Sequence, residues 1–214
     1  MGCLLWMVLW VFRTIRSLHE NHPELPLTVL SGGLFISDRS HSIGSFPHIP
    51  EANKRISQLT GVEFGTGYQE VLRDGSFVMD SESSAIGFNA LRSLAPDRAI
   101  YLASAMQQAF YYEGLSLSDP ETYRKIALAN NINPNAVLEL LNDPVAITAA
   151  RADFVKVIHL GVNSFPTLLL RNGNELISLG GAMGIDELEE RLARTNLVQN
   201  TAGEHCSLDN KNGC

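Results

Sequence analysis

The sequence predicts a mixed α/β fold in which a long all-helical segment interrupts a small sheet. Three observations support this prediction. A short apolar run at 25–30 has the composition of a buried strand. The chain from about residue 50 to residue 161 shows helical spacing almost throughout, and after Pro166 the apolar residues alternate with a period of two.

Composition and charge exclude several classes of protein. The 214 residues are 45% hydrophobic and 18% charged, which is typical of a globular chain with a packed core. A net charge of −7 argues against nucleic-acid binding, which needs clustered Lys and Arg. We therefore expect no nucleic acid among the partners of this protein.

The N-terminal residues are apolar but too few to cross a membrane. The run from Cys3 to Phe12 precedes its arginines, whereas a signal peptide has its positive charge first. Met-Gly-Cys hints at lipidation, but Trp6 stands where Ser or Thr is expected. The spacing instead predicts a helix over 6–22 and no membrane attachment.

The cysteines are too few and too scattered for a disulfide framework. Cys3 lies at one end of the chain and Cys206 and Cys214 at the other, so residues 4–205 contain no thiol. A reducing compartment permits this pattern, and we expect a cytoplasmic location. His205 and its neighbouring cysteines provide too few ligands for a tetrahedral metal site, so we predict no metal and no cofactor.

Proline and glycine positions divide the helical segment. Ser118 and Glu121 have the form of a capping box. The signals predict helices from Pro50 to Gly61, over 82–94 and 97–112, from Ser118 to Ala129, from Asn133-Pro134, and from Asp143-Pro144 to Gly161. Two of these helices carry apolar faces at helical spacing, which is typical of a face that packs on a core: Ala99, Ala103, Met106 and Phe110 in one, and Val145, Ala149, Ala152, Val155 and Ile158 in the other.

A proline loop and a hairpin follow the last of these helices. Pro166 opens the run Thr-Leu-Leu-Leu, and a proline at the start of a strand removes no ladder bond. An X–Pro bond also adopts the cis form at low cost, which suits a tight turn. The remaining pattern predicts strands at Thr167–Arg171 and Glu175–Leu179 joined by Asn172-Gly173, a helix over Ile185–Thr195, and a polar tail.

The order of elements and several segments resemble a known family. The "FPTLLL" loop between a helix and a hairpin is similar to the cis-proline loop of thioredoxin-fold proteins. The chain from about Ile15 to Asn196 resembles the DsbA-like thiol–disulfide oxidoreductases, especially the cytoplasmic bacterial members. The resemblance rests on LTVLSGGLF (27–35), GFNALRSLAPDRAIYLASAMQQAFYYEG (87–114), NSFPTLLLRNG (163–173) and ISLGG (177–181).

The resemblance implies a thioredoxin-like fold with a large all-helical insertion. The core would comprise 1–35 and 144–196, the insertion 50–143, and the polar tail 197–214. The first core strand, which would pair beside Leu25–Leu30, is absent from this order of elements.

The resemblance also implies a site of which only half is present. Ser164, Phe165, Pro166 and Thr167 match the loop that binds the substrate chain through its backbone. In the family, the first cysteine of a Cys-x-x-Cys pair at a helix N-terminus attacks a disulfide, and the second cysteine resolves the intermediate. Cys3 has no second cysteine at that spacing, so no catalytic residue is assigned.

The expected function is therefore that of a DsbA-family thiol–disulfide oxidoreductase, similar to protein disulfide isomerase, which is inactive as given. Its partners would be protein or small-molecule thiols and disulfides. Two alternatives stay open: a non-catalytic protein that binds peptides at the Phe165-Pro166 groove, and a glutathione-dependent isomerase or transferase of the same fold. The glutathione-dependent enzyme ranks last, because no Ser lies at the start of the first helix.

The genetic code suggests a reason for the missing dithiol. Codons for residues 1–12, when read one nucleotide later, permit Trp-Asp-Ala-Tyr-Cys-Gly-Trp-Cys-Tyr-Gly-Phe. This is the kind of active-site sequence that the family carries where its first helix begins. We hypothesise that residues 1 to about 14 are an out-of-frame translation of a lost strand and dithiol.

Overall fold

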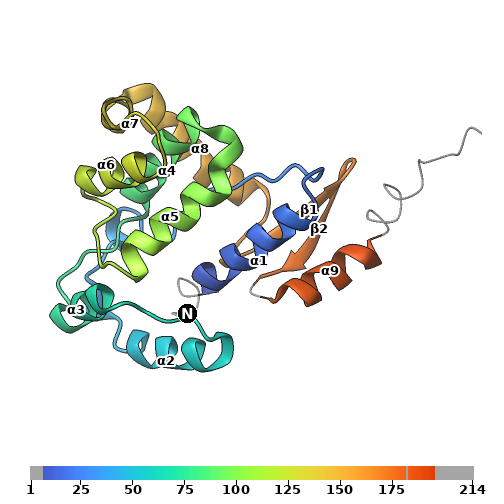
Figure 1. Ribbon diagram of the computed structural model, residues 1–214, viewed down its shortest axis with the longest axis horizontal. Helices are drawn as coiled ribbons and strands as arrows, with labels where there is room; N and C mark the ends of the chain where they lie inside the picture. The colour runs from blue at the N-terminus through green and yellow to red at the C-terminus, as the bar shows by residue number, and fades with distance from the viewer. Residues whose placement is uncertain (1–6, 182, 196–214) are drawn as a thin grey trace, which may run out of the picture.

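The computed structural model describes residues 7–181 and 183–195, which contain a block of helices beside a hairpin (Figure 1). The helices α2 to α8 form the block, and α1, α9 and the hairpin lie together on one side of it. The elements are α1 (Met7–Asn21), α2 (Ile49–Thr60), α3 (Thr66–Asp74), α4 (Ser81–Leu94), α5 (Ala99–Tyr111), α6 (Pro120–Ala129), α7 (Pro134–Leu141), α8 (Pro144–His159), β1 (Leu168–Asn172), β2 (Glu175–Gly180) and α9 (Ile185–Arg194).

Local capping signals locate several helix ends. Asn133 and Asp143 cap α7 and α8 through their side chains, each with a proline at the start of the helix, as predicted. Gly61 ends α2 in the left-handed conformation, with a φ of 67°. The predicted capping box at Ser118 is wrong, because Asp119 is the N-cap of α6 and accepts a hydrogen bond from the Glu121 amide.

The sheet of the described residues consists of β1 and β2, which pair antiparallel. Asn172 pairs with Glu175, so the two-residue loop is Gly173-Asn174 and lies one residue later than predicted. The predicted strand Leu25–Leu30 is wrong. The segment is extended but joins no ladder, because a strand needs a neighbour and the described residues contain no strand that pairs with it.

Helix α1 joins two hydrophobic clusters. Phe12 packs against the cluster formed by α4 to α7, which includes the fully buried Leu91 and Leu102. Ile15 and Leu18 belong to a second cluster between α1, α9 and the hairpin, together with Leu179, Met183, Leu188 and Leu192. The buried Thr14 hydroxyl donates a hydrogen bond to the Met183 carbonyl at 2.8 Å, which fixes α1 against the end of the hairpin.

The apolar face predicted for α5 is confirmed. Ala103, Met106 and Phe110 are buried, and Ala99 packs against the same side chains. The end of the helix separates the two neighbouring tyrosines, since Tyr111 is buried and Tyr112 is half exposed.

The apolar face predicted for α8 lies on the opposite side of the helix from the core. The side that packs against the protein consists of Ala146, Ala150, Asp153 and Val157. Val145, Val155 and Ile158 are 76%, 53% and 70% exposed, and Ala149 and Ala152 are also exposed. The inward face is harder to recognise in the sequence, because small residues and one carboxylate form it.

The described helices include none that is long and apolar enough to span a bilayer. The same part of the chain has no group of three or more His, Cys, Asp or Glu side chains placed to hold a metal ion.

His22, just after the end of α1, forms a hydrogen bond with Glu189 of α9. The His22 Nε2 atom lies 2.8 Å from a Glu189 carboxylate oxygen, and Nδ1 lies 3.3 Å from Glu24. The hydrogen bond with Glu189 is the main cause that raises the pKa of His22 above its usual 6.5, and burial partly opposes it.

This hydrogen bond predicts a pH-dependent contribution to stability. The pKa is higher in the folded than in the unfolded protein, so the stabilisation is fully present below pH 6.5 and is lost as the pH rises through the raised pKa. In urea unfolding from about pH 5 to about pH 8, we expect the free-energy difference between the parent chain and His22→Gln to be largest at the acidic end. His41→Gln, at an exposed histidine, is the control. A difference that grows with pH would contradict the prediction.

Candidate functional site

The predicted substrate-binding residues form a loop between α8 and β1. Gly161 ends the helix region with a φ of 72°, and the peptide bond between Phe165 and Pro166 is cis. The Thr167 hydroxyl donates a hydrogen bond to the Ser164 carbonyl at 2.6 Å, which closes the loop on itself. Ser164 is exposed, and the three residues after it are half buried. The loop is therefore partly exposed to solvent just before the hairpin begins.

Two glycines from distant parts of the chain, Gly32 and Gly181, support this loop. A Cβ atom on Gly32 would lie 2.4 Å from the Phe165 ring, so the ring packs directly on the Gly32 backbone. A Cβ on Gly181 would lie 2.6 Å from the Pro166 carbonyl oxygen. These contacts join the loop to segments about 130 residues before it and 15 after it. The signal in the sequence is a pair of glycines after an apolar run, which is also typical of ordinary turns.

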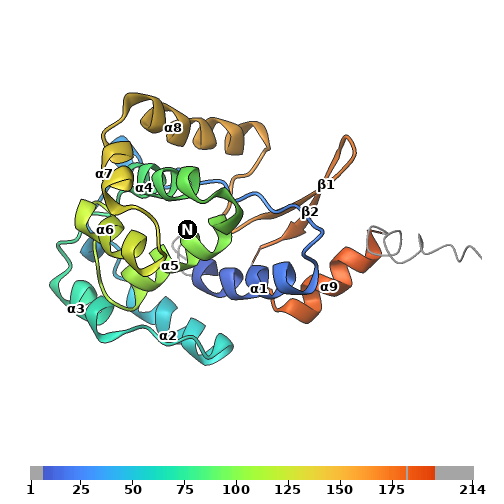
Figure 2. The same cartoon turned by 45° about the horizontal axis from the view of Figure 1, so that its top comes forward.

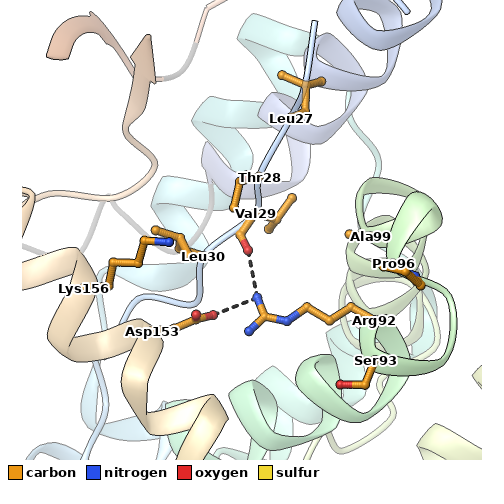
Figure 3. Close-up of a pocket in the computed structure, with 10 residues that line it drawn as sticks. All are labelled: Leu27, Thr28, Val29, Leu30, Arg92, Ser93, Pro96, Ala99, Asp153 and Lys156. Atoms are coloured by element: carbon orange, nitrogen blue, oxygen red, sulfur yellow. Dashed lines mark hydrogen bonds and ion pairs between the residues drawn. The ribbon is translucent and has the colours of Figure 1, made fainter. Parts of the chain in front are cut away.

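A pocket of about 410 Å³ lies along the extended segment that precedes Gly32 (Figure 3). Its wall comprises Leu27–Leu30 on one side, α4 and the start of α5 on another, and α8 on the third. Asp153 and Arg92 point toward each other across it, and Lys156 extends from α8 toward Leu30. The sequence does not distinguish these charged residues, because a lone Asp within a helix has no distinctive spacing.

An ion pair in this wall holds the backbone of the extended segment in place. Arg92 Nη1 lies 2.9 Å from Asp153 Oδ2 and donates a hydrogen bond to the Val29 carbonyl at 2.9 Å. The same Asp153 oxygen accepts a hydrogen bond from the Ser31 amide at 3.0 Å. Asn89 accepts two further hydrogen bonds from the Arg92 guanidinium. Arg92 and Asp153 thus neutralise each other and hold the extended segment, which leaves neither free for chemistry.

The reactive half of the predicted site has no counterpart among the described residues. Cys3, Cys206 and Cys214 all lie outside the part of the chain that the structure describes, and residues 4–205 contain no cysteine. The described part of α1 begins at Met7. The structure thus places Ser164 to Thr167 together as one loop and provides no thiol beside it within residues 7–181 and 183–195.

Comparisons with known proteins give a fold. No protein-family model matches the chain, and no curated protein sequence matches it. A "putative protein disulfide isomerase" from Nitrosomonas europaea superposes with a TM-score of 0.80 at 19% identity over 92% of this chain and 94% of that one. The cytosolic disulfide reductase DsbM from Pseudomonas aeruginosa superposes with a TM-score of 0.73 at 22% identity, over 88% of this chain and 94% of DsbM. The structure of DsbM with GSH gives a TM-score of 0.69 at the same identity, over 88% of this chain and 95% of that one.

These superpositions cover nearly the whole of each chain. The protein therefore has the thioredoxin-like fold with a helical insertion that is found in DsbA-like proteins, as the sequence predicted. Within residues 7–181 and 183–195, the sheet consists of the antiparallel pair β1 and β2.

The packing of Phe165 on Gly32 predicts a coupled pair of substitutions. Gly32→Ala should lower the free energy of unfolding by about 1–3 kcal/mol, because the new methyl group must displace the ring. In Gly32→Ala/Phe165→Ala the ring is gone, and the methyl group should add little to the effect of Phe165→Ala alone. Urea unfolding of the four chains measures the coupling. Additive effects would show that Gly32 does not support the loop.

We expect loss of the Arg92–Asp153 pair to destabilise the protein more than loss of an exposed ion pair. Asp153→Asn should lower the free energy of unfolding by about 1–3 kcal/mol, because Arg92 keeps its charge in a part-buried site without a counterion. Arg194→Ala is the control, since its pair with Glu190 is 75% and 70% exposed and should change stability by less than about 0.5 kcal/mol. Equal effects of the two changes in urea unfolding would contradict this role.

Proposed function

We propose that this protein is a thiol–disulfide oxidoreductase of the DsbA-like kind whose reactive dithiol is missing from the chain as given. The observation that carries the proposal is the partly exposed loop of Ser164 to Thr167 between α8 and β1, on a fold shared with a disulfide reductase. An exposed loop of this kind can pair with an extended substrate chain through backbone hydrogen bonds. In this proposal 1–35 and 144–196 form the core that carries the site, and 50–143 is the insertion.

The complete reaction needs two thiols at the start of α1. A thiolate attacks one sulfur of a substrate disulfide and releases the other as a thiol, and a second cysteine then displaces the substrate and leaves a disulfide in the protein. Helix N-termini favour thiolates, because unpaired N–H groups and the helix dipole stabilise negative charge. The chain as given has no thiol pair at this position, so we expect it to be inactive in this exchange.

The reading frame one nucleotide later would supply both cysteines at the start of α1. Its two cysteines fall on codons 5–6 and 8–9, and the described part of α1 begins at Met7. Thr14, Ile15 and Leu18, which fix α1 to the hairpin, lie at or after the end of the proposed out-of-frame segment. A change of frame before Thr14 would therefore restore the reactive half and keep the contacts of Thr14, Ile15 and Leu18 with the hairpin and α9, while it replaces Val11 and Phe12.

The expected partners are protein or small-molecule thiols and disulfides in the cytoplasm. Support comes from the absence of cysteine in residues 4–205 and from the cytosolic neighbour with GSH. That neighbour also favours a second candidate function, in which the chain as given binds glutathione or a peptide at the loop without chemistry. Titration calorimetry with reduced glutathione on the parent chain and Phe165→Ala tests this candidate.

Gene sequencing and a disulfide-reduction assay test the main proposal. We expect the frame one nucleotide later to continue upstream without a stop codon through a strand-coding segment and to contain both cysteine codons. The product of that frame should reduce insulin disulfides, whereas the chain as given should remain at background. Replacement of the first restored cysteine by serine should abolish the activity, because it removes the nucleophile.

Two results would overturn the proposal. A stop codon or the lack of either cysteine codon would remove the shifted frame. Insulin reduction by the chain as given would show that its activity does not depend on a Cys-x-x-Cys pair.

A further inference from the structure

Helix α8 presents an apolar stripe to solvent that the proposed function does not use. Figure 2 shows α8 along the outer edge of the helical block, with α4 on its inner side. Five apolar residues follow one another on its outer side, and the three large ones are more than half exposed: Val145, Ala149, Ala152, Val155 and Ile158. An outer helix face is normally polar, and a contiguous exposed apolar surface marks an interaction site.

We propose that a second copy of the chain covers this stripe, with the two α8 helices packed antiparallel around Ala152. In a twofold contact the same surface of each copy meets the other. The stripe must therefore fit against a second stripe that runs in the opposite direction. Ala149 and Val155 each lie three positions from Ala152, so Ala149 of each copy faces Val155 of the other and the two Ala152 residues face each other. Val145 of one copy lies beside Ile158 of the other. Small residues at the centre let the two helices approach closely, and larger ones fill the ends.

Charge along α8 favours the same antiparallel arrangement. The helix begins at the acidic cap Asp143 and has Lys156 and His159 in its last turn. Antiparallel packing brings the acidic end of each helix beside the basic end of the other and also opposes the two helix dipoles favourably. Arg151, which flanks the stripe, donates a hydrogen bond to Glu82 at 2.6 Å within its own copy. Its charge is therefore already balanced when the copies meet.

The length of α8 limits the strength of this dimer. Its 16 residues extend over about 24 Å. Such a contact buries less than the roughly 800 Å² per partner of a standard interface. The dimer should therefore be in exchange with the monomer and should depend on protein concentration.

Sedimentation equilibrium over a range of concentrations tests the proposal. The parent chain should show a monomer–dimer equilibrium, and Val155→Asp should weaken it at least about tenfold, because each dimer buries this side chain twice. Leu128→Asp is the matched control: Leu128 is 59% exposed on α6, away from the stripe, and its change should leave the equilibrium as it is. Circular dichroism of each variant verifies that it is folded. A monomer at every concentration, or equal effects of the two variants, would overturn the proposal.

Crosslinking tests the register. In a chain with Cys3, Cys206 and Cys214 replaced by Ser, Ala152→Cys should form a dimer with a short bismaleimide several-fold faster than Leu128→Cys. Both copies of residue 152 lie at the twofold axis, so the two thiols are within reach of one crosslinker. Equal rates would exclude the antiparallel pairing even if the chain dimerises by another surface.

Discussion

The ion pair between Arg92 and Asp153 holds together parts of the chain that a sheet would otherwise connect. Arg92 belongs to α4 and Asp153 to α8, and both bond to the backbone of the extended segment between them, at Val29 and Ser31. Next along that segment, Gly32 supports Phe165. A charged pair at a part-buried position requires all its hydrogen bonds to balance its desolvation, and here Asn89 and two backbone groups complete them. The position of the loop thus depends on this pair.

The loop of Ser164 to Thr167 keeps its shape without any thiol among the described residues. The loop residues Ser164 to Thr167 are held by their own hydrogen bond and by glycines on two sides. None of these contacts involves a cysteine, so the shape of the loop does not require the thiols. This independence explains how one chain can keep the fold of a disulfide reductase at 22% identity without the dithiol within its described residues.

Local signals in the sequence predicted more than long-range ones. Caps at Asn133 and Asp143, the hairpin and the proline loop depend on neighbouring residues, and all four were predicted to within one residue. The strand at Leu25–Leu30 failed because composition does not reveal whether a partner strand exists. The face of α8 failed because periodicity locates an apolar stripe without identifying its side of the helix, and the buried side contains Asp153. The supports of the loop, Gly32 and Gly181, are contacts between distant segments and could not be predicted from spacing.

The hydrogen bond from the Thr14 hydroxyl to the Met183 carbonyl anchors α1 beside the end of the hairpin. Under the proposed function, a change confined to the first ten codons would remove the nucleophile and leave the Thr14 hydrogen bond and the loop in place. Quality control that detects unfolding would not eliminate such a product. Under the proposed function, in a cell that also made a form with both cysteines, this chain would compete for the same substrates without turning them over, so its phenotype would be dominant.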